Sequence, residues 1–147
     1  MKIVFLDTNV FIDYLAQREG FYENAEHVIA LCVRRHYKVL VSALSFATAS
    51  YILSAHHKMS PGDIRSLFAN FVAHGVITPV DTQTVNESLK SGFMDFEDAM
   101  QYYSALRENA CVIITRNADD FVQSAVPVYT PIEFLEKVSI DNKTKLQ

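Results

Sequence analysis

The chain has 147 residues, half of them hydrophobic, and it carries a formal net charge of −4 at pH 7. This length and hydrophobic content fit one domain with its own core, and no apolar run approaches the ~20 residues that cross a bilayer. The acidic balance argues against broad electrostatic adhesion to nucleic acid, although it allows a local basic rim around a metal-neutralised centre. A strand pattern opens the chain in place of a targeting leader, so we expect a cytoplasmic protein with no membrane partner.

The first predicted element is a buried strand over residues 3–6, which are Ile, Val, Phe and Leu. Such a continuous β-favouring run is typical of a parallel sheet covered on both faces. It ends at Asp7, and ligands of open α/β sheets bind beyond the carboxyl ends of the strands. Asp7 can equally cap the following helix, which we expect to run through Leu15 and to end at Gly20. The stretch alone does not decide between a site residue and a cap.

Strands and helices then alternate to the end of the chain. Caps such as Ser60 with Pro61, and Thr130 with Pro131, mark helix starts. Alternation of this kind predicts a three-layer α/β/α sandwich with a central, mostly parallel sheet. We expect the domain to span residues 1–137 and a polar, frayed C-terminal tail to span 138–147. The further strands are expected at 38–42, 76–80, 111–115 and 126–129, and the further helices at 25–36, 44–55, 61–72, 82–89, 96–106 and from 131.

The two cysteines do not indicate a metal site. Cys32 falls in a helical pattern and Cys111 opens a strand pattern, so they lack the paired spacing that binds zinc. We expect both thiols to be reduced and buried.

Acidic residues gather at places that the fold should bring together. Asp95, Glu97 and Asp98 occupy the start of one helix, where first-turn acids also stabilise the helix dipole. The predicted strand at 111–115 is followed by a polar segment that contains Asp120. Asp7, Asp98 and Asp120, brought to one sheet edge, would form a pocket of like charges that a divalent cation neutralises. Oxygen ligands favour Mg²⁺ or Mn²⁺, and such a site suits phosphodiester hydrolysis.

Four segments in this order resemble the PIN domain family. They are Phe-Leu-Asp-Thr-Asn at 5–9, Asp-Phe-Glu-Asp-Ala at 95–99, Thr-Arg-Asn-Ala-Asp-Asp-Phe at 115–121 and Tyr-Thr-Pro-Ile-Glu-Phe at 129–134. The resemblance implies a metal-dependent ribonuclease, in many members the toxin of a VapC-type toxin–antitoxin pair, with RNA and an antitoxin as partners and a possible homodimer. It implies catalytic, metal-binding carboxylates at Asp7, Asp98 and Asp120. The supporting residues that it implies are Thr8, Asn9, Thr115 and Asn117, with Asp95 and Glu97 adjacent.

One position departs from the family pattern. The family carries a glutamate in the helix after the second strand, and Thr48 stands there in this chain. No acidic residue occurs between Glu26 and Asp63, so no shift of register supplies one. A threonine hydroxyl can hold a metal-bound water but adds no charge, so metal affinity should fall. The alternative is therefore a catalytically degenerate PIN-fold module that binds RNA or a protein partner.

Two other aspartate-based chemistries fit less well. A dehalogenase-like phosphoryl transferase needs a second acid two residues after Asp7, where this chain has Asn9. A receiver-type phospho-acceptor needs a lysine after its last strand, and the segment 126–129 ends without one.

Overall fold

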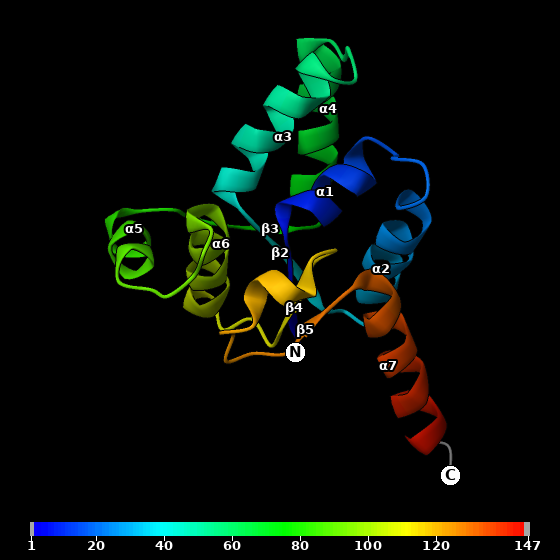
Figure 1. The fold of residues 1–147 in the computed structure, drawn as a ribbon. Coiled ribbons are helices and arrows are strands. Elements are labelled where there is room, and N and C mark those ends of the chain that lie inside the picture. Colours follow the sequence, from blue (N-terminus) through cyan, green and yellow to red (C-terminus); the bar gives the residue numbers. More distant parts are fainter. Residues whose placement is uncertain (1, 146–147) are drawn as a thin grey trace.

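A five-stranded parallel sheet with strand order β3-β2-β1-β4-β5 lies at the centre of the computed structural model, which describes residues 2–145 (Figure 1). Every strand pairing is parallel, and β1 lies in the middle between β2 and β4. The strands are β1 (Ile3–Leu6), β2 (Lys38–Ser42), β3 (Val76–Thr78), β4 (Val112–Ile114) and β5 (Val128–Tyr129). The predicted α/β class is confirmed.

Helices cover both faces of this sheet. Figure 1 shows α5 and α6 on one side and α2 and α7 on the other, while α3 and α4 extend together from the upper end. The helices are α1 (Thr8–Leu15), α2 (Tyr22–Arg34), α3 (Ala43–Ala55), α4 (Pro61–Val72), α5 (Thr82–Leu89), α6 (Phe96–Arg107) and α7 (Pro131–Lys145), and a short 3-10 helix η1 spans Ala118–Phe121. This arrangement is the predicted three-layer sandwich.

Side chains of β1 alternate between two hydrophobic clusters. Val4 and Leu6 belong to the larger cluster, which packs α1, α2, α3, α4 and α7 against one face. Phe5 points to the smaller cluster with Tyr102 of α6. Successive strand residues face opposite sides of a sheet, so a run that is apolar at every position anchors helices on both. Because β1 is anchored on both faces, its last residue, Leu6, has a fixed position, and so does Asp7, which follows it.

Two expected helix ends are wrong. Helix α1 ends at Leu15 with Ala16 as its C-cap, and Gly20 lies in the following loop with φ +85°. The chain leaves α1 through Gln17, a residue with φ +51°, so a non-glycine residue makes the turn. At the other end of the chain, α7 continues to Lys145 with Val138 buried in the larger cluster, so residues 138–145 are helical and not frayed. Residues 146–147 of the expected tail lie outside the described residues.

The expectation for the cysteines holds for one of them. Both thiols are free, and Cys32 is buried, which raises the pKa of its thiol to about 12. Cys111 is exposed, because β4 begins one residue later than the sequence pattern predicts, and its thiol donates to the carbonyl of Ile3. Among residues 2–145, no helix has both the length and the apolar character that crossing a bilayer requires.

We predict that the native protein takes up one alkyl group per chain from iodoacetamide, at Cys111. The exposed thiol meets the reagent, whereas the buried Cys32 stays protonated and covered. Peptide mass spectrometry after brief labelling checks the site, and denatured protein serves as the control that labels at both positions. Equal labelling of both cysteines in the native protein would contradict this packing.

Candidate active site

Five carboxylates line one pocket of about 350 Å³ beyond the carboxyl ends of β1 and β4. They come from three separate parts of the chain, which are the end of β1, the start of α6 and η1. Thr48 of α3 lines the same pocket, together with Arg18 from the loop after α1. We call this site the acid pocket, and its carboxylates are Asp7, Asp95, Glu97, Asp98 and Asp120.

Asp7 is held by hydrogen bonds from three directions. Its Oδ1 accepts from the backbone N–H of Thr8 at 2.8 Å, so it caps α1. Its Oδ2 accepts from Thr115 Oγ1 at 2.7 Å and from Asn9 Nδ2 at 3.3 Å. The side chain is nearly buried, and a buried carboxylate requires such partners. Asp7 is thus both a helix cap and a lining residue of the acid pocket.

Burial and mutual repulsion raise the pKa values of the acids. Burial raises the pKa of Asp7 most, and the charges of Asp120 and Asp95 add to this, against the hydrogen bonds from Thr115 and Thr8. Burial and then the charges of its acidic neighbours raise the pKa of Asp98 to about 7. Burial and the charge of Asp7 also raise the pKa of Glu97. The pocket therefore concentrates negative charge that disfavours its own ionisation.

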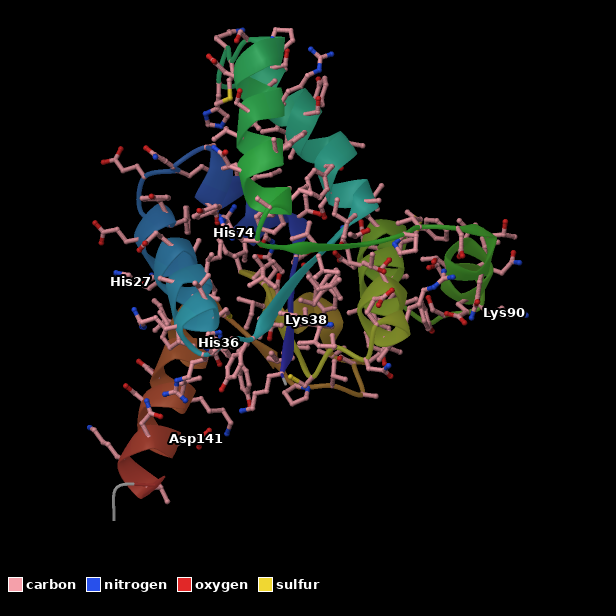
Figure 2. All side chains as sticks on the ribbon, turned by 180° about the vertical axis from the view of Figure 1, so that it is seen from behind. His27, His36, Lys38, His74, Lys90 and Asp141 are labelled. Carbon is pink, nitrogen blue, oxygen red and sulfur yellow. The ribbon has the colours of Figure 1, made fainter. Side chains whose placement is uncertain are left out.

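None of the cations in residues 2–145 forms an ion pair with a carboxylate of the acid pocket. Arg18 pairs with Asp13 instead. In the part of the chain that the structure describes, no histidine lines the pocket. His27, His36 and His74, labelled in Figure 2, belong to α2, to the turn after it and to the segment after α4. Any metal ion here would meet oxygen donors alone.

This donor set fits a hard divalent cation that keeps part of its water shell. Among the residues that the structure describes, no group of three acidic, histidine or cysteine side chains is placed to hold a metal ion by itself. Mg²⁺ binds in proteins through one or two carboxylates plus waters and substrate oxygens, so a complete protein cage is not required. The uncompensated charge and the oxygen-only chemistry are what such an ion needs.

The supporting residues implied by the resemblance lie at different depths. Thr8, Asn9 and Thr48 line the acid pocket, and Thr115 lies behind Asp7. Asn117 is not among the lining residues; its backbone N–H donates to Thr115 Oγ1 at 3.2 Å, where it begins η1.

A buried polar cluster that the sequence did not predict lies next to the pocket. Gln101 Nε2 donates to Thr8 Oγ1 at 2.7 Å and to Ser45 Oγ at 3.1 Å, and the two hydroxyl oxygens are 2.7 Å apart. Gln101 is fully buried, and the cluster ties α6 to α1 and α3. The signal that could have found it is a glutamine one helical turn after Asp98, at a spacing that continues the inner face of α6.

Two comparisons by sequence relate this chain to known proteins. A family model described as PIN domain matches residues 3–119, which ends one residue before Asp120. The chain is 27% identical over 140 residues to Ribonuclease VapC1 of Aquifex aeolicus (strain VF5), covering 91% of this chain and 94% of the relative.

Solved structures show the same fold at low identity. A toxin-antitoxin complex from Klebsiella pneumoniae has a chain with TM-score 0.62 and 20% identity, covering 87% of this chain and 97% of the other. VapBC2 from Rickettsia felis, bound to a DNA fragment from its promoter, has a chain with TM-score 0.60 and 18% identity, covering 86% and 96%.

The acid pocket predicts a pH-dependent loss of stability in metal-free protein. The pKa of Asp98 is about 7 in the folded state, against 3.8 for an ordinary aspartate. The folded protein therefore binds the proton more tightly than the unfolded chain, and stability falls as pH rises from about 4 through about 7.

Thermal unfolding in chelator-treated buffer at a series of pH values measures this effect. As pH rises to about 7, the unchanged protein should lose stability that Asp98→Asn keeps, so the melting temperature of the variant should rise relative to that of the unchanged protein. Above about pH 7 the difference should stay constant. Asp63→Asn, at an exposed acid in the first turn of α4, is the matched control. Parallel curves for all three proteins would contradict the raised pKa.

Proposed function

The chain belongs to the PIN domain family, and from this premise we propose that it is a metal-dependent endoribonuclease that hydrolyses RNA phosphodiesters. The observation that carries the proposal is the acid pocket, whose carboxylates come from three parts of the chain and have no cationic partner among residues 2–145. RNA as the substrate is supported by the relative Ribonuclease VapC1, which is similar over almost the whole chain.

We assign the cation, Mg²⁺ or Mn²⁺, to Asp7, Asp98 and Asp120. When bound, such an ion lowers the pKa of water and neutralises charge on a phosphodiester. Asp7 contributes an oriented carboxylate, because Thr115 and Thr8 fix both of its oxygens. Asp98 would contribute a carboxyl group whose pKa burial and the neighbouring acids raise to about 7, and it would give up its proton to hold a cation.

Thr48 is the reason for keeping a second candidate. Its side chain lines the acid pocket at the position of the family glutamate, and it brings no charge there. A site without that carboxylate would bind a cation more weakly, and a degenerate PIN-fold module that binds RNA or a protein is the second candidate function. Asp95 and Glu97 act in the opposite direction, because they add charge to the same pocket from α6.

The partners that we propose follow from the relatives. Structures of toxin-antitoxin complexes match most of this chain, so we propose an antitoxin partner for it. We also propose a homodimer, which rests on the resemblance to the family alone. We also propose that residues 1–137 contain the whole nuclease unit, with residues 138–145 extending α7.

We predict that Asp7→Asn abolishes metal-dependent RNA cleavage, with a loss of at least about a hundredfold, because an amide supplies neither the charge nor the second acceptor oxygen. A fluorescently labelled RNA, incubated with Mn²⁺ and with a chelator in parallel, gives the rate. Asp63→Asn on α4 should cleave like the unchanged protein. RNA that stays intact with the unchanged protein, or cleavage that persists in Asp7→Asn, would overturn the nuclease assignment.

We also predict that Thr48→Glu raises Mn²⁺ affinity by about tenfold, because it adds a carboxylate to the acid pocket at the family position. Isothermal titration calorimetry measures the affinity without reference to activity. Thr82→Glu at the exposed start of α5 adds the same charge elsewhere and is the matched control. Saturable Mn²⁺ binding that Asp98→Asn removes supports the enzyme, whereas the lack of binding by the unchanged protein supports the degenerate module.

A further inference from the structure

The loop between α1 and α2 places one arginine at the acid pocket. The backbone N–H of Arg18 donates to the carbonyl of Asp13 at 3.1 Å, and the carbonyl of Arg18 accepts from Phe21 and Tyr22. These bonds fold the loop back over the end of α1. Among residues 2–145, Arg18 is the only basic residue that lines the acid pocket, although five carboxylates share that pocket.

A buried aspartate holds this arginine from behind. The side chain of Asp13 is 2% exposed, and its Oδ1 lies 3.3 Å from Nη1 of Arg18. Its Oδ2 lies 2.9 Å from Nε of Arg116, the residue that follows Thr115 at the end of β4. Two guanidinium groups share one carboxylate, so the trio has a net charge of +1 even when Asp13 is ionised.

The two arginines differ in what else they contact. The guanidinium carbon of Arg116 lies 4.0 Å from the centre of the Phe21 ring, and its backbone N–H donates to Asn9. Arg116 is thus held in place by other contacts, and its single positive charge is enough to balance the charge of Asp13. Arg18 contacts Asp13 through a single nitrogen, and its side chain is 24% exposed. A guanidinium carries five N–H donors, and within residues 2–145 the Arg18 side chain donates only to Asp13, so most of its donors can bind a ligand in the pocket.

The geometry points to Arg18 as a contact for a phosphate of the RNA beside the cleaved bond, with Asp13 as the residue that positions it. This inference rests on the proposed function. A pocket of carboxylates repels the polyanionic RNA, and a guanidinium held at the edge of the pocket attracts the RNA backbone where it must enter. Arginine suits this task because its planar fork matches phosphate oxygens.

No other basic residue among residues 2–145 lines the acid pocket. His36, Lys38 and Lys90, labelled in Figure 2, lie in the turn after α2, in β2 and just after α5, outside the pocket. The expected electrostatic contact at the pocket therefore depends on Arg18.

The test is RNA binding without cleavage, measured in an Asp7→Asn background. Fluorescence anisotropy of a short labelled single-stranded RNA, in Mg²⁺ and at several salt concentrations, gives the affinity and its salt dependence. Arg18→Gln should weaken binding by about tenfold and lower the slope of log K against log salt by about 0.7, the value for one phosphate contact on a single strand. Arg65→Gln, at an exposed arginine of α4, should change neither quantity.

Two further variants separate contact from structure. Arg18→Lys should retain the slope because it keeps the charge, and bind more weakly because it lacks the fork. Asp13→Asn should weaken binding with the slope unchanged, because Arg18 keeps its charge and loses its support. In the cleaving protein, Arg18→Gln should raise KM by a similar factor and change kcat less. Melting curves of every variant exclude loss of folding as the cause.

The outcomes distinguish this inference from the function on which it rests. If the unchanged protein cleaves RNA, and Arg18→Gln binds RNA with the same affinity and slope as Arg65→Gln, the phosphate contact is wrong and the nuclease stands. If Asp13→Asn binds like the background protein, the positioning role is wrong. If RNA is neither cleaved by the unchanged protein nor bound by Asp7→Asn, the proposed function fails and this inference with it.

Discussion

The hydrogen bonds to the Asp7 carboxylate are the constraint on which the rest of the site depends. A carboxylate that is only 6% exposed requires donors at both oxygens, and they come from Thr8 at the start of α1 and Thr115 at the end of β4. One side chain therefore joins the central strand, the first helix and the neighbouring strand at the same point. The opening of the acid pocket is fixed by this junction, since Asn9 and Arg116 attach to it in turn.

The same junction explains why the pocket can tolerate so much charge. The donors around Asp7 favour its ionised form, but the pKa of Asp98 still rises to about 7, because burial and four neighbouring acids oppose ionisation. Folding thus holds together groups that repel one another, and the cost is met by the apolar packing of β1 and its helices. Groups held against repulsion in a pocket are typical of functional sites, since a cation or a proton relieves them on binding.

The sequence was sufficient for the parts of the site that follow from position along strands and helices. Asp7, Asp98, Asp120 and Thr48 reach one pocket because parallel strands end at one edge and helices begin there. The sequence did not predict the pairing of Asp13 with Arg18, because that pairing needs a loop that turns back after α1. The turn is made at Gln17, which has a positive φ, so no glycine marks it in the sequence. The exposure of Cys111 likewise depends on where β4 begins, a boundary that hydrophobic pattern locates only to within a few residues.

The position of Thr48 depends on the buried polar cluster that holds its helix, α3. Gln101 binds both Thr8 and Ser45, so α3 is tied to α6 and α1 one turn before Thr48. A helix fixed in this way keeps Thr48 at the pocket, where its hydroxyl can hold a water but supplies no charge. The carboxylates of α6 supply that charge instead, because three of the five acids stand at its start. The pocket therefore remains strongly acidic without a carboxylate from α3. A pocket that keeps five acids without a carboxylate from α3 still offers the oxygen donors that a divalent cation binds.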